Sequence, residues 1–236
     1  MSKITREPND LLAALSESDR RQLAPHLTQV ELRLSAILTE PYTPLKHAYF
    51  LHESMVSLVS MTSEGTSVEV AMVGSEGLIG VTAMLQVESS PYRALVQVPG
   101  GASRIEIKKL KILFDERVTL RRLILRYLHA LMTQTAQSAV CSRFHSVEQR
   151  LARWLLSSRD RAHKNSFNYT QEFLSTMLGA DRSTTTIAAG VLKRAGLVKY
   201  TRGTITILNS KELEHVACEC YQVLNREFQG ILHSSS

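Results

Sequence analysis

The residue types best suited to nucleic-acid chemistry lie together in one segment. Arg182 opens a predicted helix and is followed by Ser183 and three threonines, Thr184 to Thr186. An arginine can donate two hydrogen bonds to a guanine edge, and hydroxyl groups can bond bases or phosphates. Three consecutive threonines are unusual in a helix built only for packing, because β-branched residues are indifferent helix formers. The segment therefore predicts the base-reading end of a DNA-binding helix.

A winged helix-turn-helix is predicted to position this segment. Thr170 stands where a helix N-cap belongs, Gly179-Ala180 makes a tight turn, and Asp181 caps the next helix. A β-hairpin turning at Arg202-Gly203 follows and would lie beside the second helix as a wing. The predicted elements are a helix ending at Leu178, a helix over 182–195, and strands over 198–201 and 204–208.

The charge distribution points to the same part of the chain. The net charge is +6, and residues 143–203 hold eleven basic and four acidic side chains. A concentrated positive charge favours a polyanionic partner. The alternative is a solvated basic face that serves only solubility.

The composition is that of a folded protein with more than one part. The chain has 236 residues, of which 44% are hydrophobic and 21% charged, so disordered, collagen-like and disulfide-scaffold classes are excluded. No apolar run approaches the roughly 20 residues that span a bilayer, and no apolar signal core follows the N-terminus. Three cysteines suit a reducing compartment, so we expect a cytoplasmic protein without a membrane partner.

Short strands dominate the first hundred residues after a predicted helix over 10–23. One hairpin is expected over 55–61 and 68–73, and a second over 92–98 and 102–108 around Pro99-Gly100-Gly101. Without helical crossovers between the strands, a sandwich or barrel is favoured over a parallel sheet.

A long helix is predicted from Val118. One stripe follows helical spacing, and its members are Leu120, Ile124, Leu128, Leu131, Thr135 and Ala139. A stripe of this length leaves apolar surface for a second copy of the chain, so a homodimer is expected. The alternative is a helix that packs only on its own barrel.

The whole order resembles the CRP/FNR superfamily of bacterial transcription regulators. The segments that carry the resemblance are 34–38 with 49–51, 74–80, 147–152, and 170–198. The resemblance implies an α+β fold with a jelly-roll β-barrel similar to cyclic-nucleotide-binding domains in residues 1–117. It also implies a dimerisation helix over 118–145 and a winged helix-turn-helix DNA-binding domain with a C-terminal helix over 146–236.

The resemblance also implies roles for single residues in DNA binding. It places Thr170 and Gln171 at the phosphate backbone and Arg182 against guanine. Ser183 replaces a glutamate and Ile187 an arginine of the cyclic-AMP-receptor pattern, so the operator is expected to differ. The remaining expected contacts are hydroxyl bonds from Ser183, Thr185 and Thr186, a thymine methyl against Ile187, and phosphate contacts from Lys193 and Arg202.

The expected effector pocket departs from the pattern of cyclic-nucleotide-binding members. Gly80 is followed by Val81 instead of glutamate, and Arg93 is followed by Ala94 instead of serine. Losing a hydrogen bond to a charged group costs about 1.5–3 kcal/mol, so high-affinity cyclic AMP binding is not expected. Arg93 could hold a different anion with Thr135 on the far wall, or a nearby carboxylate could satisfy it.

No cofactor and no metal ligand set are predicted. The three cysteines, Cys141, Cys218 and Cys220, are fewer than an iron–sulfur cluster needs. Cys218 and Cys220 are expected in one helix that continues past residue 224, where positions two apart point in different directions and cannot share an ion. Cys220 is then a core residue and Cys218 a surface or interface thiol. His47, His52 and His129 have no spacing that distinguishes haem ligands from surface histidines.

The sequence therefore predicts a homodimeric, sequence-specific DNA-binding transcription regulator and not an enzyme, since phosphate-binding and nucleophile motifs are absent. Expected partners are double-stranded DNA, a second copy of the chain, an unidentified small-molecule effector and, from the resemblance, RNA polymerase. Two alternatives stay open: a redox or haem-based sensor of the same superfamily, and a β-barrel that binds a ligand or protein but no DNA.

Overall fold

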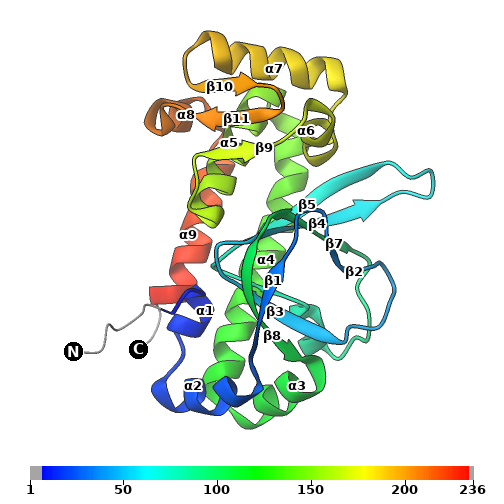
Figure 1. The fold of residues 1–236 in the computed structure, drawn as a ribbon, viewed down its shortest axis with the longest axis vertical. Coiled ribbons are helices and arrows are strands. Elements are labelled where there is room, and N and C mark those ends of the chain that lie inside the picture. The colour runs from blue at the N-terminus through cyan, green and yellow to red at the C-terminus, as the bar shows by residue number, and fades with distance from the viewer. Residues whose placement is uncertain (1–6, 234–236) are drawn as a thin grey trace.

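The N-terminal half is built on two antiparallel four-stranded sheets (Figure 1). The computed structural model describes residues 7–233, so the outermost ends of the predicted domains, 1–6 and 234–236, lie outside it. One sheet has the order β1 (Thr28–Leu32), β8 (Gly100–Glu106), β3 (His47–Leu51), β6 (Leu78–Ile79). The other has the order β2 (Ile37–Thr39), β7 (Arg93–Val98), β4 (Met55–Met61), β5 (Ser67–Val73). The two sheets are separate, which makes a jelly-roll-like arrangement and not a closed barrel.

One of the two predicted hairpins is confirmed and the other is wrong. Strands β4 and β5 pair antiparallel with Val56 opposite Val73. Strands β7 and β8 belong to different sheets, and Gly100 and Gly101 are strand residues, not a turn. A Cβ on Gly101 would lie 2.9 Å from Nδ1 of His52. These glycines therefore allow a close approach of backbone to side chains, which a sequence pattern does not distinguish from a turn.

Short helices flank the sheets. The predicted helix over 10–23 is two helices, α1 (Asp10–Ala13) and α2 (Glu17–Leu23), because Ser16 accepts a hydrogen bond from the backbone N–H of Asp19 and caps a new start. Helix α3 (Ile107–Glu116) was not predicted as a helix. Short 3₁₀ turns cover Ala24–His26 and Val81–Leu85.

Helix α4 (Val118–Phe144) packs along the sheets (Figure 1), and the first four members of its predicted apolar stripe pack within the same chain. Leu120, Ile124, Leu128 and Leu131 are all buried in the core of the same chain. A different row stays exposed: Val118, Leu125, Met132, Val140 and Phe144. The first three of these are seven residues apart, which is the repeat of a coiled-coil seam.

The C-terminal half combines five helices with a small three-stranded sheet. Its elements are α5 (Val147–Ala162), β9 (Ser166–Asn168), α6 (Gln171–Leu178), α7 (Arg182–Arg194), β10 (Val198–Thr201), β11 (Thr204–Ile207), α8 (Ser210–Val216) and α9 (Cys220–His233). Trp154, Tyr169 and Phe173 hold the unit together, with ring centroids 4.9 Å apart for Trp154 and Tyr169 and 5.0 Å for Tyr169 and Phe173. The predicted helix-turn-helix and its wing are confirmed.

The predicted single helix through Cys218 and Cys220 is wrong. Helix α8 ends at Val216 and α9 begins at Cys220, so Cys218 lies in the break between them. Ala217 has φ −65° and ψ 149°, an extended conformation that turns the chain. All three cysteines are buried, so Cys218 is not a surface thiol.

Helix α9 returns from the C-terminal unit to the sheets. It packs along α4, and Phe228 and Ile231 join the core of the N-terminal half (Figure 1). None of the helices in the described part of the chain combines the length and the apolar character that a bilayer span requires.

A buried ion pair also joins the two halves. Nε of Arg161 on α5 lies 2.8 Å from Oε1 of Glu76 in the loop after β5, and the two side chains are 6% and 12% exposed. The guanidinium of Arg161 also lies 5.2 Å from the ring centre of Phe228 on α9. Arg161 therefore joins α5 to two segments that are distant in sequence, the loop after β5 and α9.

Candidate nucleic-acid interface

Helix α7 begins at a side-chain cap that uses part of the hydroxyl row. Oδ1 of Asp181 accepts from the backbone N–H of Thr184 at 2.8 Å. The hydroxyls of Ser183 and Thr184 donate to the same carboxylate at 2.5 and 2.6 Å. These bonds from Ser183 and Thr184 lower the pKa of Asp181, which keeps the cap ionised. The hydroxyl of Ser183 is thus directed toward its own helix cap.

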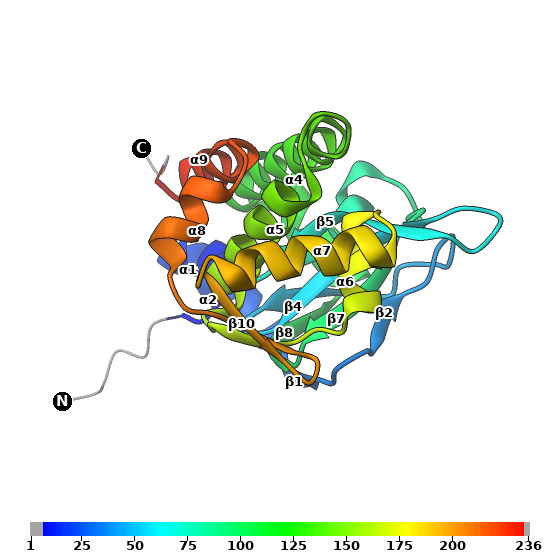
Figure 2. The same ribbon diagram turned by 90° about the horizontal axis from the view of Figure 1, so that it is seen from above.

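The outer face of α7 is presented to solvent above the rest of the molecule (Figure 2). Arg182, Ser183 and Thr186 are exposed, and Ile187 is 61% exposed. Ala188, Ala189 and Leu192 are buried on the opposite face against α5. The Ile187 side chain therefore points outward, as the expected thymine contact requires.

Thr185 is a correction to the predicted set. Its side chain has 0% exposure, and its hydroxyl donates to the backbone carbonyl of Asp181 at 3.0 Å. Three consecutive helical residues point in three directions about 100° apart, so a run of three threonines cannot share one face. Thr185 packs inside and does not face DNA.

The residues expected at phosphates surround this face. Thr170 caps α6 by accepting from the N–H of Phe173, and the hydroxyl of Thr186 donates to Oε1 of Gln171 at 2.9 Å. Lys193 near the end of α7 and Arg202 at the tip of the wing are exposed. Arg202 and Gly203 have φ values of 49° and 80°, the pair of left-handed residues that a tight hairpin turn needs.

Two further cations belong to the same surface and were not predicted. Arg194 in the last turn of α7 and Lys199 on β10 are exposed. Lys199 stands at an outward position of the wing strand, where alternation places it on the side opposite the buried Val198. That alternation was the signal that could have identified it.

The predicted effector residues are only partly brought together. Gly80 and Thr135 line a cavity of about 50 Å³ between the sheets and α4, together with Thr39, Leu45, Val81, Ser90 and Tyr92. Small-molecule sites usually have roughly 300 Å³ or more. The cavity as it stands is therefore small for a nucleotide.

Arg93 does not line this cavity. Its Nε lies 2.9 Å from Oε2 of Glu40, and both side chains are partly exposed. The structure thus shows the second of the two arrangements expected for Arg93, an arginine satisfied by a nearby carboxylate.

A partly buried carboxyl group at the junction of the two halves has a raised pKa. Glu69 on β5 accepts from the indole N–H of Trp154 at 2.8 Å and from the hydroxyl of Ser57. Burial raises the pKa of Glu69 to about 7, although both hydrogen bonds act in the opposite direction. The ionised form is thus disfavoured in the folded chain.

We expect the contribution of Glu69 to stability to fall as the pH rises. The pKa of Glu69 is higher in the folded than in the unfolded chain, so ionisation of Glu69 destabilises the fold. This destabilisation is absent below about pH 4.5 and complete above about pH 7. Glu69→Gln mimics the neutral form and should raise the free energy of unfolding by about 1–2 kcal/mol at about pH 8, with little change at about pH 5. Urea unfolding at both pH values measures this, and an equal effect at both would contradict it.

Comparison with known proteins places this surface in a family context. A family model of the Crp-like helix-turn-helix domain matches residues 149–216. No curated protein matches the chain. FixK2 from Bradyrhizobium japonicum has a similar fold, with a TM-score of 0.69 at 15% identity over 81% of this chain and 98% of that one.

Two further solved structures have a similar fold. TTHA1359, a CRP/FNR-family transcriptional regulator from Thermus thermophilus, has a TM-score of 0.67 at 20% identity over 80% of this chain and 98% of that one. The c-di-GMP-responsive global regulator CLP of Xanthomonas campestris has a TM-score of 0.66 at 15% identity over 81% and 99% of the two chains. The resemblance inferred from the sequence is thereby confirmed: the chain carries a Crp-like helix-turn-helix domain within the fold of the CRP/FNR transcriptional regulators.

Proposed function

We propose that the protein is a homodimeric transcription regulator that binds a two-fold-related DNA site in a sequence-specific way, and not an enzyme. The observation that carries this proposal is the outward face of α7, which presents Arg182 at its N-terminal end. In helix-turn-helix proteins, the N-terminal residues of the second helix contact base edges in the major groove. The proposed division into a sensor over 1–117, a dimerisation helix over 118–145 and a DNA-binding domain over 146–236 follows the same scheme.

The proposed base contacts come from three side chains. Arg182 donates to guanine, and Ile187 packs on a thymine methyl. The hydroxyl of Thr186 donates to Gln171, so it contributes as an acceptor from a base. Ser183 contributes less than its position suggests, because its hydroxyl is held by Asp181. The proposed phosphate contacts are Thr170, Gln171, Lys193, Arg194, Lys199 and Arg202.

The proposed dimer uses the exposed row on α4. Leu125 and Met132 are 45% and 67% exposed, and pairing with the same row of a second copy would remove this surface from water. Two recognition helices carried by such a dimer would enter major grooves about 34 Å apart. RNA polymerase is the proposed further partner, and the cytoplasm the proposed compartment.

The proposed effector is not cyclic AMP. The walls at the expected ribose and phosphate positions are apolar, since Val81 and Ala94 are both buried. The nearby arginine is engaged by Glu40. We propose that the cavity takes a small, largely apolar effector or none, and that a ligand acts only through unequal affinity for two arrangements of the domains.

Arg182→Ala tests the proposed function. We expect the affinity for the preferred site to fall about 10-fold per half-site, and discrimination at one base position to relax, because a bidentate contact to guanine is worth about 1–3 kcal/mol. Fluorescence anisotropy on sites selected from random duplexes measures both. Lys193→Ala should weaken all sequences equally and reduce the salt slope by about one per half-site, or about two on the full site.

Arg226→Ala is the matched control, since Arg226 is an exposed cation on α9, away from α7. It should leave affinity and specificity unchanged. The proposal fails if the unaltered protein selects no sequence at low ionic strength, or if Arg182→Ala and Arg226→Ala behave alike.

A further inference from the structure

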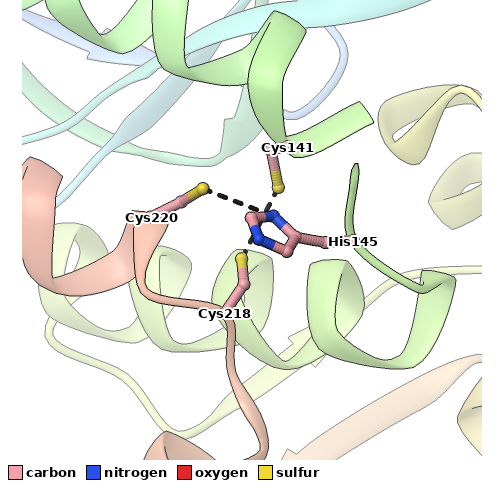
Figure 3. A group of neighbouring side chains, drawn as sticks. All are labelled: Cys141, His145, Cys218 and Cys220. Atoms are coloured by element: carbon pink, nitrogen blue, oxygen red, sulfur yellow. Dashed lines mark hydrogen bonds between the residues drawn. The ribbon is translucent and has the colours of Figure 1, made fainter. Parts of the chain in front are cut away.

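Four side chains with metal-ligand chemistry meet where α4 ends. Cys141 lies in the last turns of α4 and His145 directly follows that helix. Cys218 lies in the break between α8 and α9, and Cys220 is the first residue of α9 (Figure 3). One ligand atom of each lies within 4.8 Å of all the others. The folded chain thus brings together residues that are more than seventy positions apart in sequence.

The separations fit ligands of a single tetrahedral ion. The sulfur atoms of Cys141 and Cys218 are 3.6 Å apart, and Sγ of Cys220 is 3.5 Å from Nδ1 of His145. With Zn–S of about 2.3 Å and Zn–N of about 2.0–2.1 Å, a tetrahedral site has edges of about 3.8 Å between sulfurs and about 3.6 Å between sulfur and nitrogen. These two separations match the edges of such a tetrahedron, and all four ligand atoms lie within 4.8 Å of one another.

A second contact orients the histidine as a ligand. Nε2 of His145 lies 3.1 Å from Oε1 of Glu219, while Nδ1 faces the sulfur atoms. Metal-binding histidines almost always donate their other ring N–H to a carboxylate, a carbonyl or a water, which fixes the tautomer. Glu219 stands between the two clustered cysteines of its own segment, so the same short segment supplies both ligands and this orienting group.

The surroundings suit thiolates. Arg150 is 8% exposed and Arg153 lies nearby, and the charges of these two arginines interact with the thiol of Cys141. The side-chain amide of Gln137 donates to Sγ of Cys220 at 3.1 Å. Three thiolates and one Zn²⁺ carry a net charge of −1, which the two arginines would offset.

We propose that Cys141, His145, Cys218 and Cys220 form a structural Zn²⁺ site that fixes the end of α4 to the junction of α8 and α9. Three cysteines and one histidine in a closed tetrahedron are a ligand set of structural zinc. An iron–sulfur cluster distributes its ligands over separate irons and spreads them more widely than the 4.8 Å observed. Binding releases the thiol protons to solvent, with no change of oxidation state.

Metal content of the purified full-length chain tests the proposal. We expect about one zinc per chain by mass spectrometry of the metal, after purification with a reductant and without chelator. Replacing zinc with Co²⁺ should give thiolate-to-cobalt charge-transfer bands in the near ultraviolet and the intense visible bands of a tetrahedral site. Cys141→Ser and Cys218→Ser should lose these bands and the bound zinc.

Glu219→Gln tests the site in a variant that is expected to fold, because the cysteine variants could lose zinc by misfolding. Its side chain is 71% exposed, so folding should persist, while zinc affinity measured by competition with a chelator should fall about 10–100-fold. His215→Asn, an exposed histidine in α8, is the matched control and should leave affinity unchanged.

Two results would overturn the site. One is a folded, reduced protein without zinc and without cobalt bands. The other is a Cys141–Cys218 disulfide in protein isolated without reductant, together with no metal uptake after reduction. Both measurements are made without DNA, so their outcome is independent of the proposed function.

Discussion

Met132→Glu is expected to convert the proposed dimer into monomers and to lower the affinity for a two-half-site DNA by about 10²–10⁴-fold, the usual gain from linking two binding modules. Met132 is 67% exposed in the middle of the exposed row on α4. In a parallel pair, two glutamates would face each other across the seam, with a charge repulsion that the buried surface does not offset. Because the side chain is already in solvent in the single chain, folding should be unaffected.

Sedimentation velocity and anisotropy on full and half sites measure this effect. Affinity for an isolated half-site should hardly change, since Met132 lies on α4 whereas α7 packs mainly against α5, α6 and β10. Leu34→Glu places the same charge at an exposed apolar residue between β1 and β2 and should preserve the dimer. A dimeric Met132→Glu, or a monomeric unaltered chain, would refute the proposed seam.

The second large effect is expected from Arg161→Ala, which should lower the free energy of unfolding by about 3–5 kcal/mol, the usual cost of removing one partner of a buried ion pair. Arg161 and Glu76 are almost wholly buried, so the change leaves a carboxylate without its cation. The contact with the Phe228 ring is lost as well. Urea unfolding followed by circular dichroism measures the loss.

Two comparisons separate the two causes of this loss in stability, the unpaired buried charge and the lost packing. Arg161→Met combined with Glu76→Gln should cost much less than Arg161→Ala, because no uncompensated charge remains. Arg21→Ala removes an ion pair with Glu17 whose side chains are 75% and 73% exposed, and it should cost less than about 1 kcal/mol. Equal losses for Arg161→Ala and Arg21→Ala would contradict the assigned role.

Local signals made the C-terminal unit predictable. Thr170 and Asp181 cap their helices as expected, and Arg202-Gly203 turns the wing. Each of these features depends on backbone hydrogen bonds within a few residues, which the sequence encodes directly. The helix-turn-helix is therefore the part of the fold that the sequence predicts best.

Long-range packing decided the features that were not predicted. The apolar stripe of Leu120 to Leu131 was correctly identified as a stripe, but only the folded sheets show that it packs within its own chain. Likewise, β7 and β8 follow each other in sequence yet pair with strands of different sheets. Hydrophobic spacing reports that a face is buried, not which partner covers it.

The candidate site residues also differ in whether local sequence or tertiary packing determines their position. The exposure of Arg182 and Ile187 follows from their positions along the helix. The burial of Thr185 and the ion pair between Arg93 and Glu40 depend on how the folded chain packs. The four-residue cluster around Cys141 required a helix break at Cys218, which no glycine or proline marks. Sequence spacing alone could not have placed those thiols together.

The return of α9 to the sheets constrains how a signal could reach DNA. The recognition unit is attached to the rest of the chain at both its beginning, after α4, and its end, through α9. A segment that is held at both ends cannot rotate about a single hinge. A change in the orientation of α7 therefore requires movement both at the connection after α4 and where α9 packs. Regulation in this molecule would therefore require the segment from α5 to α8 to rotate as one rigid body, with movement at both connections. Weakening either connection alone should make this segment more mobile without giving it a defined new orientation.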